Sequence, residues 1–336
     1  MKFDTTFFPS NDIRADVQQI EQAEKLGFDG MWSAEVAHNP FFPLTVGAKE
    51  TSKIELGTQI AVAFPRSPMV TAQIAWDLAQ QSNGRFILGL GTQVRAHITR
   101  RFSEEWVDPI SRMREYIEGM RAIWDTFQND ARLRYRGQHY EFRLMAPFFN
   151  PGSIDHPHIP IYIAGVNAKI CRLAGEVCDG LHAHGFHTVS YLNDVVMTNI
   201  KQGLDESNRN RNEFALTIPV FVVTGSSPEE TRKAEIEAKS RIAFYGSTPS
   251  YKAVMEHHGW DDIGMKLSQM ARQGQWNDMW KEVSDEMLHE IAVVSEPDNL
   301  INTLQKRYAE LGDRICLEWK ADNFELMQTI AQQIRT

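Results

Sequence analysis

The sequence predicts an α/β protein built as a single (β/α)8 TIM barrel with insertions, and two observations lead to this fold class. The first is a repeated alternation of short apolar runs with helical patterns, which occurs eight times along the chain. The second is a complete β-α-β unit at residues 54–92, which implies parallel strands joined by a right-handed crossover. Eight β/α pairs fit a closed barrel better than a doubly wound sheet, so one domain over residues 1–336 is expected.

The β-α-β unit shows how each element is recognised. Residues 54–62 carry apolar or β-branched side chains at period two, and residues 86–91 form a short apolar run, so both ranges predict strands. Between them, Ser67-Pro68 is typical of a helix N-cap and first turn, and Asn83-Gly84 is typical of a helix end.

The same criteria place the other elements in order. Strands are predicted at residues 2–8, 28–32, 54–62, 86–91, 159–164, 180–183, 214–223 and 314–317. Helices are predicted at residues 13–26, 67–83, 110–127, 169–175 and 190–207, and from Ser227, Ser295 and Asn323 onward. Three ranges interrupt this pattern: a polar and aromatic loop at 33–43, an irregular excursion with a hairpin around Gly137 at 128–158, and a mostly helical insertion near 246–290.

Composition excludes several functional classes. With 42% hydrophobic and 24% charged residues the chain has the make-up of a globular protein, and no apolar run approaches the ~18 residues that a membrane span needs. A net charge of -9 argues against a nucleic-acid partner. No secretory leader is visible in the first ten residues, and the three cysteines lack C-x-x-C spacing, so a cytoplasmic protein with free thiols is expected.

Several motifs, in order and spacing, resemble one known family. They include Arg66-Ser67-Pro68, the run GRFILGLGT at residues 84–92, IYIAG at 161–165 and LAGEVCDG at 173–180. Over nearly its whole length the chain is similar to the luciferase-like monooxygenase superfamily, and AVAFPRSPMVTA, GLGTQVRAHI and APFFNPG resemble its branch of probable coenzyme F420-dependent oxidoreductases. The resemblance implies the barrel fold, a small organic substrate, a homodimer, and F420 as cofactor, with FMN as the alternative.

Candidate catalytic residues follow the second strand. The resembling family often carries an acid and a histidine shortly after the tryptophan that is Trp32 here; Glu35 takes the acid's place, while Val36 stands where the histidine would be. His38 can replace it, because a neutral imidazole can exchange a proton while a hydride moves to or from the cofactor. A loop histidine bonded to the backbone is the structural alternative.

Candidate cofactor-binding residues lie where strands three to six end, which is the catalytic face of a barrel of this type. The resemblance implies a bulge with a non-proline cis peptide at Thr58-Gln59-Ile60, behind the cofactor ring. Small residues between the fifth strand and its helix leave backbone N–H groups free for a phosphate, although a tight turn without a ligand is the alternative. The predicted cofactor-binding residues are Gln59, Ile60, Thr92, Gly165, Val166, Asn167, Lys169 and His184.

Two motifs point to other chemistry. Gly89-Leu90-Gly91 lacks the third glycine of a dinucleotide fingerprint, since position 94 is Val, and small residues there are expected to admit a flat ring. The triplet His182, His184 and His187 follows strand six and raises the alternative of a metal-dependent hydrolase, but the first strand offers only Asp4 as a further ligand, so no metal is expected. An FMN-dependent monooxygenase and a non-catalytic ligand-binding protein also remain open.

Overall fold

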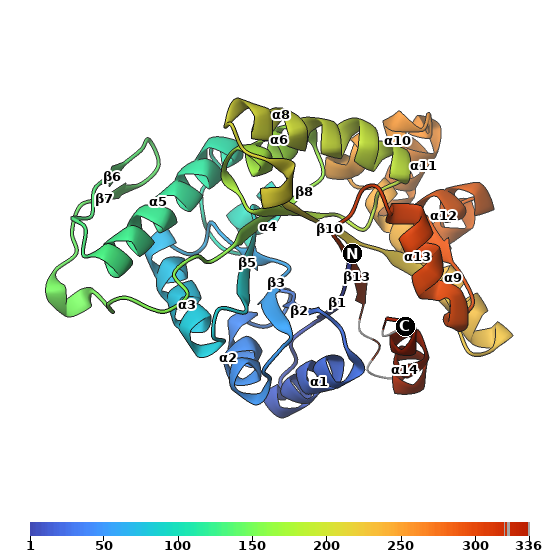
Figure 1. The fold of residues 1–336 in the computed structure, drawn as a ribbon. Helices are drawn as coiled ribbons and strands as arrows, with labels where there is room; N and C mark the ends of the chain where they lie inside the picture. The colour runs from blue at the N-terminus through green and yellow to red at the C-terminus, as the bar shows by residue number, and fades with distance from the viewer. Residues whose placement is uncertain (319, 321–322, 335–336) are drawn as a thin grey trace.

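A closed barrel of parallel strands forms the centre of the computed structural model, which describes residues 1–318, 320 and 323–334 (Figure 1). The strands follow the order β3-β2-β1-β13-β10-β9-β8-β5-β4, and β3 also pairs with β5, which closes the sheet on itself. The barrel strands are β1 (Lys2–Phe7), β2 (Gly30–Ser33), β3 (Glu55–Thr58), β4 (Ala61–Val62), β5 (Phe86–Gly91), β8 (Ile161–Gly165), β9 (Gly180–Ala183), β10 (Ala215–Pro219) and β13 (Arg314–Glu318). Because β3 and β4 are two parts of one predicted strand, the eight predicted strand positions and the barrel are confirmed.

Helices surround the barrel, and many begin or end at the residues that the sequence indicated. Ser67 accepts a hydrogen bond from the Val70 amide at the start of α3, and Gly27, with a φ of 95°, ends α1. The α-helices of the barrel's first half are α1 (Ile13–Leu26), α2 (Phe41–Glu50), α3 (Pro68–Gln81), α4 (Arg95–Arg100), α5 (Pro109–Asn129) and α6 (Ala168–Val177). Those of the second half are α7 (Val189–Tyr191), α8 (Thr198–Glu206), α9 (Pro228–Gly246), α10 (Lys252–His257), α11 (Asp261–Arg272), α12 (Asp285–Ile291), α13 (Leu300–Tyr308) and α14 (Phe324–Gln332).

Short turns of other helical types complete the chain. A π-helical segment, η2 (Leu192–Met197), joins α7 to α8. The 3-10 segments are η1 (Pro147–Phe149), η3 (Arg211–Glu213), η4 (Pro249–Tyr251), η5 (Trp276–Glu282) and η6 (Pro297–Asn299). The predicted insertion near 246–290 is therefore mostly helical, as expected. In the part of the chain that the structure describes, no helix is both long and apolar enough to cross a membrane.

The structure differs from the sequence prediction at residues 214–223 and within the loop predicted at 33–43. The range 214–223 is two strands, because β10 ends at Pro219, whose nitrogen has no hydrogen to donate to a sheet, and β11 (Phe221–Val223) pairs instead with β12 (Ala292–Val294). Helix α2 begins at Phe41, inside the range predicted as a loop. The hairpin around Gly137 is confirmed: β6 (Tyr135–Arg136) pairs antiparallel with β7 (Glu141–Phe142), and it projects away from the barrel in Figure 1.

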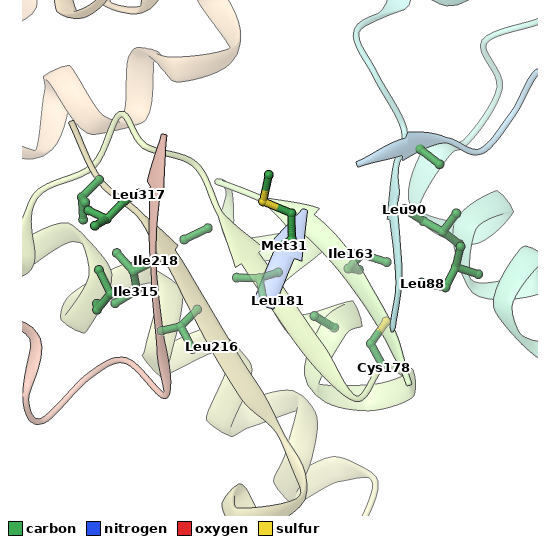
Figure 2. Packing of buried hydrophobic residues seen from close by; sticks show 14 of the residues in the cluster. Met31, Leu88, Leu90, Ile163, Cys178, Leu181, Leu216, Ile218, Ile315 and Leu317 are labelled. Carbon is green, nitrogen blue, oxygen red and sulfur yellow. The ribbon is translucent and has the colours of Figure 1, made fainter. Parts of the chain in front are cut away.

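Side chains along each strand alternate between two apolar layers. Leu181, Ile315 and Leu317 belong to the large core between barrel and helices, part of which Figure 2 shows. The residues that alternate with them point inward: Trp32 on β2 contacts His182 on β9 at 4.9 Å between ring centroids, although these strands are not adjacent in the sheet. The barrel interior is therefore filled by side chains.

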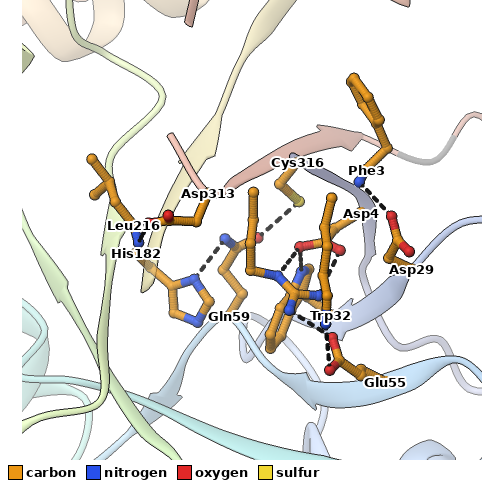
Figure 3. Close-up of polar contacts among 12 residues, drawn as sticks. Phe3, Asp4, Asp29, Trp32, Glu55, Gln59, His182, Leu216, Asp313 and Cys316 are labelled. Atoms are coloured by element: carbon orange, nitrogen blue, oxygen red, sulfur yellow. Dashed lines mark hydrogen bonds and ion pairs between the residues drawn. The ribbon is translucent and has the colours of Figure 1, made fainter. Parts of the chain in front are cut away.

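A buried ion pair forms the lower layer of that interior. Arg314, at the start of β13, donates to both carboxylate oxygens of Asp4 at 2.6 and 2.7 Å and to Glu55 at 2.6 Å, and Trp32 Nε1 donates to Asp4 at 3.0 Å (Figure 3). Burial alone would lower the pKa of Arg314, but Asp4 and Glu55 outweigh it and the pKa is raised. The guanidinium therefore stays charged, and this layer fixes the strands beneath the site.

Candidate active site

The third barrel strand is interrupted where the resemblance placed a bulge. The Gln59–Ile60 peptide bond is cis, which confirms that prediction, and it separates β3 from β4. Thr58 Oγ1 donates to the Gly89 carbonyl at 2.6 Å and accepts from the Gly89 amide at 3.0 Å. Hydrogen bonds of a side chain therefore replace the backbone hydrogen bonds between the strands there. A Cβ on residue 89 would lie 1.8 Å from the Thr58 carbonyl oxygen. The glycine at 89 is thus required by contact with the interrupted strand, in addition to the flat ring that small residues there are expected to admit.

Gln59 directs its side chain into the barrel, toward His182 and Cys316 (Figure 3). Cys316 Sγ donates to Gln59 Oε1 at 3.3 Å, and Gln59 Nε2 lies 3.1 Å from His182 Nδ1. Because an amide nitrogen only donates, His182 accepts at Nδ1 and carries its proton on Nε2. Burial, reinforced by Arg314, lowers the pKa of His182 to about 3, so this layer is neutral.

Glu35 is held by an arginine that the sequence analysis did not single out. Its carboxylate receives two hydrogen bonds from Arg66, each 2.8 Å long, and one from the Val62 amide at 2.7 Å. The Glu35 amide in turn donates to the Ile60 carbonyl at 3.2 Å. With its side chain only 9% exposed and both oxygens occupied, Glu35 is arranged to anchor the loop after β2 to the interrupted strand.

His38 lies farther along the same loop with its side chain exposed. Within residues 1–318, 320 and 323–334, no hydrogen bond to His38 is formed, so the alternative of a histidine bonded to the backbone is not what the structure shows. The loop is braced next to it, since Arg101 donates to the Val36 carbonyl. The structure does not bring His38 into contact with the other predicted residues, and its role stays a prediction.

The loop from β8 to α6 offers unused donors. Asn167 occupies the N-cap position of α6, but its side chain does not cap the helix. Its side-chain nitrogen Nδ2 donates instead to the Ser250 carbonyl at 3.3 Å. In the described part of the chain, the amides of residues 168–170 have no protein acceptor and Lys169, which is exposed, forms no ion pair. Gly165 is buried, and a Cβ there would lie 2.7 Å from Leu181 Cδ1. Open amides, a helix dipole and a free cation together fit an anionic group.

Thr92 and Ile60 stand at the neighbouring strand ends. Thr92 is partly exposed after β5, and its Oγ1 donates to the carbonyl of Gln93, a residue with a φ of 59°. Ile60 is partly buried and covers Gly91, where a Cβ would lie 2.5 Å from Ile60 Cδ1. Both residues therefore lie at the barrel's C-terminal face, which is where the sequence placed them.

The three histidines after β9 have separate surroundings. His187 Nδ1 lies 2.7 Å from the His184 carbonyl and its Nε2 lies 3.2 Å from the Tyr308 hydroxyl, while His182 contacts Gln59. His184 packs instead between Tyr245 and Tyr251. No group of three or more His, Cys, Asp or Glu side chains in the described ranges is arranged to hold a metal ion, so nothing supports the hydrolase alternative.

The two tyrosines are the residues that sequence reasoning missed. Tyr245 lies in the last turn of α9 and Tyr251 belongs to η4, so neither follows a barrel strand and no pattern in the sequence marked them. Other aromatic residues near loops lie apart from them: Phe148 is 90% exposed on η1, and Trp260 stacks on His258 with ring centroids 4.4 Å apart. A cavity of about 80 Å³ between β11, α9 and α14 includes none of the predicted site residues in its lining.

The closed parallel sheet with its surrounding helices defines a TIM-barrel protein, with polar side chains and free amides at one end of the barrel. Residues 2–314 match the family model described as luciferase-like monooxygenase, and the chain belongs to that family.

The chain is also similar to individual proteins over nearly its whole length. An uncharacterized protein of Mycobacterium tuberculosis (strain ATCC 25618 / H37Rv) is 40% identical over 312 residues, which cover 93% of this chain and 92% of that protein. The 5,10-methylenetetrahydromethanopterin reductase of Archaeoglobus fulgidus is 28% identical over 315 residues, covering 91% and 90%. Among solved structures, the coenzyme F420-dependent tetrahydromethanopterin reductase of Methanopyrus kandleri superposes with a TM-score of 0.82 at 20% identity, covering 98% of this chain and 97% of that one.

Proposed function

We propose that this protein transfers a hydride between coenzyme F420 and a small organic substrate. The observation that carries the proposal is the start of α6, where amides and a lysine, Lys169, that have no partner among the described residues fit the phosphate of a flavin or deazaflavin. Preference for F420 over FMN is supported by the Archaeoglobus relative, because its name is that of a reductase and the similarly folded Methanopyrus reductase is titled F420-dependent.

In this proposal each strand end has a separate task. Gly165, Val166, Asn167 and Lys169 hold the phosphate-bearing tail, and Gln59, Ile60 and Thr92 line the place of the ring. When bound, the deazaflavin supplies a carbon that gives or takes the hydride. The protein's own contribution is orientation and a neutral, buried layer directly beneath the ring, since His182 is uncharged and Gln59 is held by Cys316.

Proton transfer is assigned to His38, at an imidazole nitrogen. Glu35 and Arg66 fix the beginning of its loop and Arg101 braces the middle, so the histidine is exposed on a positioned segment. Glu35 then acts through the loop, because a carboxylate that already accepts three hydrogen bonds is a poor base.

Titration of the cofactor-free protein with F420 and with FMN tests the proposal. Tighter binding of F420 supports it, whereas tighter binding of FMN would favour a monooxygenase on the same scaffold. Binding of neither would leave a barrel that has lost its cofactor chemistry.

A further inference from the structure

His184 has a fixed tautomer with an unused donor. The backbone amide of Phe186 donates to His184 Nδ1 at 3.0 Å, so Nδ1 must present a lone pair and the neutral ring must carry its proton on Nε2. That Nε2–H has no acceptor among the described residues. It is also not one of their fully buried polar atoms that lack a partner, so it is accessible to solvent.

The imidazole stays neutral over the physiological range. Burial, with a contribution from His187, lowers the pKa of His184 to about 3. An imidazole that does not take up a proton at pH 5 to 8 is unsuited to acid–base exchange, but its N–H remains a hydrogen-bond donor of constant strength.

Two tyrosines flank this donor. The ring centroids of Tyr245 and Tyr251 lie 4.4 and 4.5 Å from that of His184 and 5.2 Å from each other. Neither phenol oxygen forms a hydrogen bond within the described residues, and both are accessible to solvent. Three aromatic rings thus bring together three neutral polar groups that can donate.

The position of Tyr251 ties the cluster to the catalytic face. Its segment, η4, touches the proposed cofactor loop through the bond from Asn167 to the Ser250 carbonyl. The following helix, α10, leads to His258, whose Nε2 lies 2.7 Å from Thr188 Oγ1 on the loop that carries His184. The cluster is therefore held between the ends of β8 and β9.

We propose that His184, with Tyr245 and Tyr251, forms the substrate-recognition element of this enzyme, where His184 Nε2–H donates to a neutral acceptor on an apolar ring of the substrate. A ketone oxygen or a ring nitrogen has this chemistry. That the ligand is a substrate rests on the proposed function, whereas the existence of the donor site does not.

Charge favours a neutral acceptor over an anion or a cation. The nearest ionised groups to Tyr245 are Arg241 and Glu318, and they form a bidentate pair with each other, with Nη2 to Oε1 at 3.0 Å. His187 is also neutral, since burial lowers its pKa to about 4. Among the described residues beside the three rings, an anion would therefore meet no free positive charge, and a quaternary ammonium would meet no free carboxylate.

Two substitutions separate recognition from structure. His184→Asn can keep an oxygen near the Nδ1 position to accept from the Phe186 amide but has no donor near Nε2. His184→Gln can place an amide N–H near Nε2 but loses the acceptor at Nδ1. The probes are 1-indanone and indane, which share a bicyclic skeleton and differ in the ketone, and their dissociation constants are measured by ligand-observed NMR on the full chain.

The expected readout is the ratio of indanone to indane affinity. It should fall about fivefold in His184→Asn, the effect of one net hydrogen bond, and stay within about twofold of wild type in His184→Gln. If His184 were purely structural, the ratio would fall more in His184→Gln than in His184→Asn. That order, an unchanged ratio in both variants, or no binding of either probe to wild type overturns the proposal.

Cofactor titration of the same variants keeps the two proposals apart. F420 affinity is expected to be unchanged in His184→Asn, and a loss of F420 affinity without a change in the probe ratio would assign His184 to the cofactor and overturn the substrate assignment. Failure of wild type to bind F420, with the ratio change intact, would overturn the proposed function and leave the donor site standing. Tyr251→Phe, which keeps the ring, should shift the ratio less than His184→Asn; a larger shift would make Tyr251 the principal donor and contradict the assignment.

Discussion

Glu35 and Arg66 form a bidentate ion pair that joins the loop after β2 to the loop between β4 and α3. Both hydrogen bonds are 2.8 Å long, and the side chains are only 9% and 17% exposed. The same carboxylate accepts from the Val62 amide, so the pair also fixes the continuation of the interrupted strand. One carboxylate therefore holds three segments of the catalytic face in place.

Replacing this carboxylate should lower stability. Glu35→Gln leaves the Arg66 guanidinium largely buried without a counter-charge, so the free energy of unfolding should fall by about 2 to 3 kcal/mol. Urea denaturation measures this. The matched control is Glu256→Gln in the exposed pair with Lys252, where a change within about 0.5 kcal/mol is expected. Equal effects in the two variants would show that the Glu35 pair does not hold the loop.

The buried histidines should make stability depend on pH. Burial lowers the pKa of His182 and His184 to about 3 and that of His187 to about 4. The unfolded chain takes up protons as pH falls below ~6.5 while the folded chain does not, so stability should drop by roughly 1 to 2 kcal/mol per histidine between pH 6.5 and 5.

Urea midpoints across this window measure the slope. His187→Asn removes one titrating group and should flatten it, whereas His156→Asn, at an exposed histidine, should leave it unchanged. A slope unaffected by His187→Asn would mean that this imidazole is already charged in the folded protein.

Lys169 should contribute to cofactor affinity without contributing to stability. It is exposed and unpaired, within the described ranges, in the first turn of α6. Lys169→Ala is expected to weaken F420 binding about tenfold, through loss of one phosphate contact, with no change in melting temperature. Lys201→Ala, an exposed lysine on the neighbouring α8, is the control. Unchanged F420 affinity in Lys169→Ala would remove this lysine from the phosphate site.

His38→Ala tests the assignment of proton transfer. If an imidazole nitrogen of His38 exchanges the proton, kcat should fall by roughly 10² to 10⁴ with the cofactor dissociation constant nearly constant. Steady-state kinetics on an identified substrate provide the measurement, with His289→Ala on the distant α12 as control. Retention of most of the kcat in His38→Ala would show that the proton comes from another group.

Most of the barrel was predictable, because period-two runs and helix caps are local signals. Ser67 caps α3 as predicted, and apart from β10 each barrel strand lies within about two residues of its predicted range. The early end of β10 had a local signal as well, Pro219, which was read as part of a longer strand. Helix α2 had a weaker local signal, because its N-cap position is Pro40, which has no capping side chain.

The site was less predictable because its contacts are long-range. The cis peptide before Ile60 was expected only from family resemblance, since nothing in a period-two pattern marks it. The partner of Glu35 lies 31 residues away, and Tyr251 reaches His184 from the insertion. The number of residues between the two members of each pair matches no known motif, and these side chains come together only in the folded barrel.

The central claim is that this barrel binds F420, and paired titrations test it most directly. Cofactor-free protein is titrated with F420 and with FMN under identical conditions, following cofactor fluorescence, and bound FMN is then challenged with F420. We predict that F420 binds at least about tenfold more tightly and displaces FMN, a difference of about 1.4 kcal/mol. Tighter binding of FMN, or binding of neither cofactor, would contradict the account.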